Sequence, residues 1–485
     1  MSTLALIAWL APGVGALLAV AAGRRAGQAA VIGPTVTAAI GAAALAGAPI
    51  APIDAVGGLM LLLVGGLTAT VQSYALRQLA NSRGAAQTTA LLGVAASGTS
   101  VFATAEPFVA IAAGWSVASI AFLGVLAAHR HLPTGPDALR RAIIAFAVAD
   151  LALWAAVVLD ATGAEAGTAI AVLLVIAAAA RAAQFPLHGW LVTTVAAPTP
   201  VCAFLHAGIV NAGGILLLRQ QDVLTASTPA MALAIAIGGV TMVTAALAMA
   251  VRSDVKGQLA CSTSAQMGFM LMTCGLGAWA ATIIHIVGHA MYKAAGFLGA
   301  GGAIAEHVRR RTVPLAPAAH TAPAIQAVLS GLAPAAGLAL VATAVGAGSE
   351  KSVLLVFAWI TGAVALWSAL RRANTPGEML AASLVATAMA AAYLLGATGL
   401  SEALGLPSAD GHPAAAWALV PLAAALSAML AWRHGGPVRD RLYMRAVRLS
   451  RPRPTPHWHL GGDPATRPAS AVSGPSTAVA EGGAA

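Results

Sequence analysis

Three ionisable side chains recur every four residues in the apolar stretch IIHIVGHAMYKAAGF, namely His285, His289 and Lys293. This spacing places them on one stripe of a helix, and such a stripe must face protein or water rather than lipid. Imidazoles and an amine can exchange protons near neutral pH, which predicts a hydrated proton relay. Two other interpretations are open: a hydrogen-bonded stripe that only packs helices together, and a metal site at the two histidines, which would need a further ligand.

Three more ionisable groups lie within apolar runs: Asp150 in AFAVADLALW, Arg181 in AAAARAAQFPLHGW and His206 in PTPVCAFLHAGIVNAGG. Asp150 and Arg181 fall on adjacent predicted helices and can neutralise each other, either as a purely structural ion pair or with Arg181 tuning the carboxylate. Arginine keeps its proton in proteins, so Arg181 cannot carry protons. We expect Asp150 to take up protons, His206 to relay them beside a helix break, and the stripe to continue the path.

Asp254 and Lys256 are further candidates for the proton pathway, on the predicted cytoplasmic side. The alternative is that they form an ordinary solvated loop pair. The cysteines Cys202, Cys261 and Cys274 lie in apolar stretches and lack the paired spacing of a disulfide framework or a metal site. We therefore expect no catalytic centre, cofactor or metal in this chain.

The composition excludes a soluble enzyme and excludes disorder as the main state. Of 485 residues, 59% are hydrophobic and only 9% are charged, against about 25% charged in an ordinary soluble domain. Apolar runs of about 20 residues predict roughly fifteen membrane-spanning helices in an all-α polytopic protein. The expected spans are 4–22, 30–48, 55–75, 86–104, 107–128, 138–159, 167–193, 198–218, 229–251, 258–277, 280–300, 324–346, 352–370, 377–396 and 413–432.

The basic residues predict the orientation, because lysine and arginine gather on the cytoplasmic side of membrane proteins. Nearly all of them follow odd-numbered spans, and only Arg219 and Lys351 fall in loops on the other side. The pattern predicts an outside N-terminus and a cytoplasmic C-terminus. The expected organisation is N-terminal helices in 1–85, a translocating core in 86–345, C-terminal helices in 346–435 and a basic, disordered cytoplasmic tail in 436–485.

Two of the expected spans contain a proline that removes a backbone donor. The seventh runs into Pro186, and the twelfth contains Gly331 and Pro334. Interrupted helices in corresponding halves of a chain indicate inverted repeats that line a cavity. A simple proline kink is the alternative. We expect two inverted repeats, each with one broken helix.

The motifs at these residues resemble the proton-translocating antiporter-like membrane subunits, a family with respiratory L-type, Mrp-type and DabB branches. The stretches that carry the resemblance are RAAQFPLHGWLVTTVAAPTPVCAFLHAGIVNAGGILLLR, which begins at Arg181, and DVKGQLACSTSAQMGFMLMTCGLGAWAATIIHIVGHAMYKAAGFL, which begins at Asp254. The resemblance covers about residues 90 to 345.

Departures from the family pattern favour the DabB branch. Where respiratory and Mrp-type members carry a glutamate after tryptophan, Trp115 is followed here by Ser116, and Arg181 stands where lysine is usual. Val341 aligns with a lysine of the respiratory pattern. The phrases APTPVCAFLHAGIVNAGG and QMGFMLMTCGLG are similar to those of DabB.

The DabB resemblance implies a bacterial plasma membrane subunit that conducts protons or sodium ions. It also implies a peripheral DabA-like zinc partner, which hydrates CO2 to bicarbonate while this chain holds no zinc. The alternative is a proton-pumping L-type subunit of an NADH–quinone oxidoreductase or a related hydrogenase complex. A stand-alone sodium/proton antiporter is a third interpretation.

Overall fold

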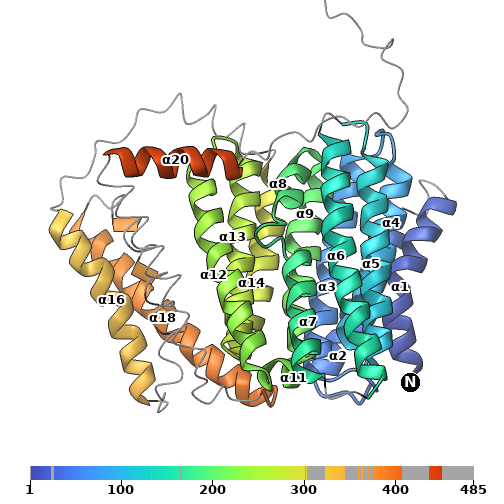
Figure 1. Ribbon diagram of the computed structural model, residues 1–485, viewed down its shortest axis with the longest axis horizontal. Helices are drawn as coiled ribbons and strands as arrows, with labels where there is room; N and C mark the ends of the chain where they lie inside the picture. Colours follow the sequence, from blue (N-terminus) through green and yellow to red (C-terminus); the bar gives the residue numbers. More distant parts are fainter. Residues whose placement is uncertain are drawn as a thin grey trace, which may run out of the picture. The chain divides into compact units, whose positions relative to one another are not determined.

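The regular elements in the described part of this computed structural model are all helices (Figure 1). The structure describes residues 2–22, 27–132, 134–163, 166–300, 323–344, 375–406 and 436–450, with single residues between 302 and 370. The N-terminal helices are α1 (Thr3–Ala21), α2 (Ala29–Leu45), α3 (Ala55–Gln78), α4 (Ala85–Thr104), α5 (Phe108–Ala128) and α6 (Gly135–Ala161).

The middle of the chain contains several short helices between longer ones. These elements are α7 (Gly167–Arg181), α8 (Gly189–Thr193), α9 (Thr199–Ala207), α10 (Ala212–Arg219), α11 (Gln221–Thr225), α12 (Thr228–Ala250), α13 (Val255–Gly275) and α14 (Trp279–Leu298). The later helices are α16 (Pro323–Ala344), α18 (Pro376–Ala403) and α20 (Gly436–Ser450). The prediction of an all-α fold is confirmed.

Polar capping residues fix where many of these apolar helices begin. The side chain of the residue before the helix accepts a hydrogen bond from a backbone N–H of the first turn, which that turn cannot satisfy itself. Helices α1, α3, α12, α13 and α18 begin in this way, at Ser2, Asp54, Ser227, Asp254 and Thr375. Seven described helical segments are long and apolar enough to cross a membrane, when α9 and α10 are counted together as one segment, Thr199–Arg219.

The predicted seventh and eighth spans are both interrupted. Helix α7 ends at Arg181 and the chain continues through a turn at Pro186 to α8, which confirms the first predicted break. The second interruption lies at Gly208, between α9 and α10, where a 3₁₀ turn replaces a continuous helix. The sequence had predicted one uninterrupted span there.

Two expectations for the C-terminal part differ from the structure. Helix α16 runs without a break through Gly331 and Pro334, because an internal proline removes only one backbone donor and need not end a helix. Side-chain donors bond carbonyls of this region: Trp359 bonds the Gly331 oxygen at 2.7 Å and Thr387 the Ala333 oxygen at 2.9 Å.

The predicted disordered tail also begins too early, because residues 436–450 form the amphipathic helix α20. Most of the predicted span 352–370 and all of 413–432 lie outside the described residues, as do residues 451–485.

Facing glycines let neighbouring helices approach to backbone contact. A Cβ atom added at Gly98 of α4 would lie 2.7 Å from the carbonyl oxygen of Gly114 in α5. A Cβ atom at Gly238 of α12 would lie 2.5 Å from the oxygen of Gly268 in α13. Small residues at such contacts are the usual way to pack helices in lipid, where apolar burial gives little driving force. These contacts position α5 and α13, which carry most of the buried hydroxyl groups described below.

We predict that Gly238→Ala destabilises the protein by about 1 to 3 kcal/mol, because the added methyl group must push α12 and α13 apart. Gly66→Ala in α3 is the matched control, since nothing lies within 4 Å of its added Cβ atom. Thermal unfolding of the purified protein in detergent measures both. Equal melting temperatures for the two variants would show that the α12–α13 contact is not tight.

Candidate functional site

Arg181 ends α7 and is held in a slot between two aromatic rings. Its side chain is 1% exposed, and its guanidinium carbon lies 4.5 Å from the ring centroid of Trp115 and 4.4 Å from that of Phe146. It donates hydrogen bonds to the hydroxyl of Ser119 and to the backbone oxygen of Trp115. A cation at the C-terminal end of a helix also interacts favourably with the helix dipole. The charge of Arg181 is therefore fixed in place.

Asp150 of α6 is held by hydroxyl groups of α5 rather than by Arg181. Its two carboxylate oxygens accept hydrogen bonds from Ser116, at 2.6 Å, and from Ser119, at 2.7 Å. Trp154 in turn donates to the Ser116 hydroxyl at 3.0 Å. No direct ion pair joins Asp150 and Arg181 among the described contacts, so the expected pair is bridged by Ser119. The hydroxyl of Ser119 accepts from the guanidinium and donates to the carboxylate.

His206 lies in the last turn of α9 and is fully buried. Its ring stacks on Phe297 at a centroid distance of 4.3 Å, and its Nδ1 lies 3.2 Å from the hydroxyl oxygen of Thr263. The Thr263 hydroxyl donates to the backbone oxygen of Leu259. Nδ1 of His206 therefore carries the proton that it shares with Thr263. Among the described residues, Nε2 of His206 has no hydrogen-bond partner.

The helix break at Gly208 makes the backbone next to His206 available to side chains. The amide of Asn211 donates to the oxygen of Ala207 at 2.7 Å. Nε2 of His289, in α14, lies 2.9 Å from the backbone oxygen of His206. A carbonyl oxygen only accepts, so Nε2 of His289 carries a proton.

The predicted stripe on α14 faces the polar side of α13. The rings of His285 and His289 stack at 5.6 Å, and Nδ1 of His289 lies 3.1 Å from the side-chain oxygen of Gln266. The Lys293 side chain is 0% exposed, and its ammonium donates to the Leu259 backbone oxygen at 3.0 Å and to the hydroxyl of Ser262.

The Leu259 carbonyl oxygen connects the lysine to His206. It accepts from both Lys293 and Thr263, and Thr263 contacts His206. The structure thus brings His206, His289 and Lys293 into one buried network. Within the described residues, no hydrogen bond joins this network to Asp150 and Arg181.

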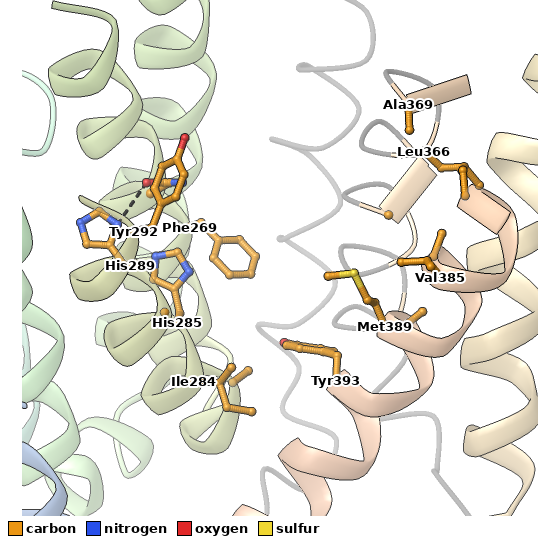
Figure 2. Close-up of a pocket in the computed structure, with 17 residues that line it drawn as sticks. Phe269, Ile284, His285, His289, Tyr292, Leu366, Ala369, Val385, Met389 and Tyr393 are labelled. Carbon is orange, nitrogen blue, oxygen red and sulfur yellow. Dashed lines mark hydrogen bonds between the residues drawn. The ribbon is translucent and has the colours of Figure 1, made fainter. Parts of the chain in front are cut away.

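A cavity of about 580 Å³ lies beside the stripe (Figure 2). Its walls are mostly apolar, with His285 and Phe269 on one side and Met389 and Tyr393 of α18 on the other. Among the described residues, no three His, Cys, Asp or Glu side chains lie close enough together to hold a metal ion. A metal at the two stripe histidines therefore finds no third such ligand in the described part of the chain.

Asp254 and Lys256 both make hydrogen bonds within the protein. Asp254 caps α13 and pairs with Arg252 at 2.7 Å. Burial raises the pKa of Asp254, but hydrogen bonds from Arg252 and from the Gly257 N–H lower it by more, so the pKa lies below its usual value. Lys256 donates to the Ala197 backbone oxygen at 3.2 Å. Their part in a proton pathway remains a prediction.

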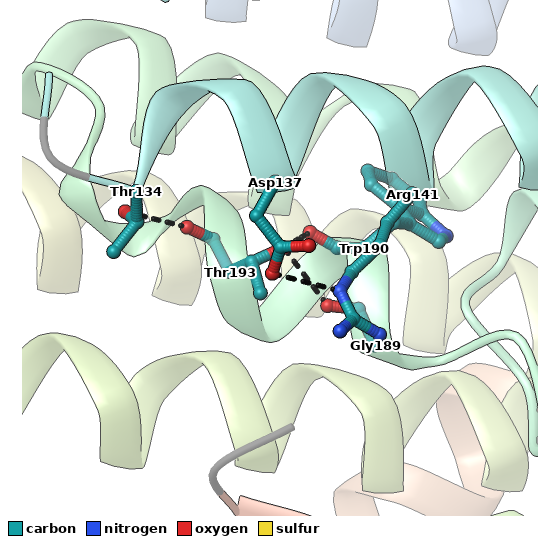
Figure 3. A network of polar contacts seen from close by, with 6 residues as sticks. All are labelled: Thr134, Asp137, Arg141, Gly189, Trp190 and Thr193. Carbon is teal, nitrogen blue, oxygen red and sulfur yellow. Dashed lines mark hydrogen bonds and ion pairs between the residues drawn. The ribbon is translucent and has the colours of Figure 1, made fainter. Parts of the chain in front are cut away.

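A second polar group fixes the segment that follows the Arg181 break. In Figure 3 it joins the start of α6 to α8. Thr134 donates to the backbone oxygen of Thr193 at 3.5 Å, and Arg141 pairs with Asp137 at 2.9 Å. The Thr134 contact thus connects the start of α6 to the end of α8, whereas the Arg141–Asp137 pair lies within α6.

Comparison with known proteins agrees with this architecture. Residues 154–330 match a protein family described as NADH:quinone oxidoreductase/Mrp antiporter, TM. The matched segment contains Arg181, His206 and the α14 stripe. The chain thus resembles the antiporter-type membrane family over this segment. The resemblance seen in the sequence motifs is confirmed, and the chain is a multi-pass membrane protein.

Individual relatives from two branches of this family align with part of the chain. Over 141 residues the chain is 48% identical to the probable inorganic carbon transporter subunit DabB of Hydrogenovibrio crunogenus, covering 29% of this chain and 27% of the relative. Over 272 residues it is 28% identical to NADH-quinone oxidoreductase subunit L of Mycobacterium tuberculosis, covering 52% and 43%. The alignments therefore span less than half the length of either relative.

A solved structure supports the fold over nearly the whole chain. A chain of the Mrp complex from Dietzia sp. superposes with a TM-score of 0.56 at 25% identity, covering 95% of this chain and 53% of that one. Antiporter-type subunits work within multi-subunit membrane complexes, and this chain has the fold of such a subunit.

We predict that the orientation of the Gln266 side-chain amide depends on the protonation state of His289. The carbonyl of His206 only accepts, so a neutral His289 needs a donor at Nδ1, which the Gln266 amide supplies after a flip. Gln266→Glu offers only acceptors and should raise the pH at which His289 is half protonated by about one unit, because charged hydrogen bonds are about twice as strong as neutral ones.

Nitrogen-15 NMR of histidine-labelled protein in bilayers measures this titration, with His289→Gln assigning the signal. Gln266→Leu, which offers neither donor nor acceptor, should move the titration to lower pH. Identical titrations in the glutamate and leucine variants would show that Gln266 does not contact the imidazole.

Proposed function

We propose that this chain is the ion-conducting membrane subunit of an inorganic carbon accumulation complex, with protons as the conducted ion. The observation that carries the proposal is the buried network of His206, His289 and Lys293, which lies in the family-matched segment. The 48% identity to a DabB subunit over 141 residues supports the carbon-pump branch.

The network has the properties that proton conduction requires. Each of His206, His289 and Lys293 can bind or release a proton, and hydrogen bonds to the Thr263 hydroxyl and to two backbone oxygens hold them in one buried network. Because a backbone oxygen only accepts, ordered water would have to carry the proton between these groups. Buried ionisable groups are costly in a membrane and usually mark ion pathways. Two acceptors, the Leu259 oxygen and the Ser262 hydroxyl, fix the position of the Lys293 nitrogen, so the amine left after proton release can regain a proton at the same place.

Asp150 is the proposed acceptor on the α5–α6 side. It is half-buried, and its hydrogen bonds come from neutral hydroxyls. Arg181 supplies a permanent positive charge nearby without exchanging protons itself. Ordered water would have to carry the proton from this group to His206.

The partner in this proposal is a soluble DabA-like zinc protein on the cytoplasmic face, where CO2 would be hydrated to bicarbonate. Its binding, its zinc and the direction of coupling are parts of the proposal. The membrane would be the bacterial plasma membrane, with the C-terminus of this chain in the cytoplasm, as the distribution of basic residues predicts.

A second candidate is a proton-pumping L-type subunit of an NADH–quinone oxidoreductase, favoured by the 28% identity to that subunit over 272 residues. The two candidates differ in the direction of energy transfer. In a carbon pump the ion gradient is consumed, whereas in an oxidoreductase electron transfer builds it.

The experiment is growth of a carbonic-anhydrase-deficient bacterium in ambient air, with this chain expressed alone, with its zinc partner, or with the partner and an uncoupler. We expect growth only with the pair and none with the uncoupler. Failure of a well-expressed, copurifying pair would overturn the carbon-pump proposal and favour the oxidoreductase candidate.

We predict that Lys293→Met in the same assay reduces growth in air to that of the empty strain, because the network loses its ammonium. Thr70→Val is the control, since the Thr70 hydroxyl only bonds its own helix at Gly66. Protein level and copurification of the partner should be unchanged in both variants. Normal growth with Lys293→Met would remove this residue from the pathway while leaving the carbon-pump proposal standing.

A further inference from the structure

Helix α20 lies across the helix bundle rather than along it (Figure 1). Its last residue is tied to the end of α12, because the Ser450 backbone oxygen accepts a hydrogen bond from Arg252 at 3.0 Å. Leu449 packs on Val192, Ala248 and Cys261, which places it over α8, α12 and α13. The C-terminal end of α20 is therefore fixed at the level where α12 leaves the membrane.

The other end of α20 lies at the same level, because α20 runs across the ends of the bundle helices (Figure 1). Both ends are thus expected at one membrane surface. Further arginines lie on this side, namely Arg77 in the last turn of α3, Arg83 before α4 and Arg140 near the start of α6.

The two faces of α20 differ in character. Leu442, Ala446 and Ser450, spaced by four residues, form the inward face that covers the protein. The exposed residues include three arginines, a methionine and one acid, which are Arg441, Met444, Arg445, Arg448 and Asp440, so the positive charges outnumber the negative one. Such a basic amphipathic pattern is typical of helices that lie in the membrane interface.

The exposure of Tyr443 indicates what α20 contacts besides the protein. It lies three residues before Ala446, and so on the same side of the helix as the buried residues, yet it is 47% exposed. The inward side of α20 therefore extends past the helices beneath it, toward the plane of the bilayer. Tyrosine is enriched at this depth because its ring is apolar and its hydroxyl is polar.

We propose that α20 is an interfacial helix that binds anionic phospholipid headgroups through Arg441, Arg445 and Arg448, with Tyr443 at headgroup depth. An acidic soluble protein is a less suitable occupant, because it would approach from the cytoplasm and leave Tyr443 uncovered. The fixed orientation parallel to the membrane and the arginines beside the exposed tyrosine fit a lipid surface. This proposal is independent of the ion and the substrate discussed above.

The test uses the full-length protein in nanodiscs of phosphatidylcholine with a minor fraction of phosphatidylglycerol, and native mass spectrometry measures the phosphatidylglycerol that stays bound. The variant is Arg441→Gln/Arg445→Gln/Arg448→Gln. Each arginine near an anionic surface contributes about fivefold in affinity, so the triple variant should bind phosphatidylglycerol on the order of a hundredfold more weakly. The control is Arg77→Gln/Arg83→Gln/Arg140→Gln, which removes the same charge from exposed positions on the same side.

We expect weak binding only in the α20 variant, and loss of bound phosphatidylglycerol from the unchanged protein at 1 M salt, where the Debye length is about 3 Å. Equal binding in the α20 and control variants would overturn the proposal. Unchanged phosphatidylglycerol with loss of a soluble partner would also overturn it, and would make α20 a protein-docking helix. If the triple variant does not fold, the Arg445→Gln variant and the salt series test the same proposal.

Discussion

The hydrogen bond from His289 to the backbone oxygen of His206 joins α14 to the interrupted α9–α10 segment. An unpaired carbonyl in an apolar slab costs free energy, so a broken helix needs donors from elsewhere. His289 supplies one to His206 and Asn211 supplies another to Ala207. Because the break needs the histidine and the histidine gains a fixed orientation from the break, neither feature can be changed alone without leaving a buried polar atom unpaired.

The same requirement explains why small hydroxyl residues recur around the charges. Ser119, Ser262 and Thr263 each touch an ionisable side chain or its partner. A hydroxyl can accept from a cation and donate to an anion or a carbonyl at the same time. The Ser119 hydroxyl can therefore lie between Asp150 and Arg181 and give each of them a hydrogen-bond partner.

Much of the fold follows from apolar run length and from capping residues. The predicted spans agree closely with α1 to α6 and with α12 to α14, because lipid requires a length of about 20 residues. The single stripe of His285, His289 and Lys293 also follows from spacing alone. The break at Gly208 could not be predicted in this way, since glycine is common within membrane helices. The signal that could have indicated it is the cluster of Gly208 and Asn211 with two further glycines, Gly213 and Gly214, in the first turn of α10.

Other features depend on partners that are distant in sequence. Ser119 and Gln266 are ordinary polar residues in apolar helices, and only the packing of α5 on α6 and α13 on α14 gives them a role. The helical state of α20 was missed because its composition is strongly basic. The helical spacing of its buried positions, rather than its composition, indicates that this segment is a helix.

The slot that holds Arg181 between Trp115 and Phe146 also has a consequence for ion selectivity. A positive charge fixed beside Asp150 repels any hydrated cation that approaches the carboxylate from within the protein. Among the described residues, the side chains that bond this carboxylate are the hydroxyls of Ser116 and Ser119, which are few ligands for a metal cation. A proton needs no coordination shell and can pass along a hydroxyl. In the proposed pathway, the aromatic slot would therefore act as a barrier to sodium ions more than to protons.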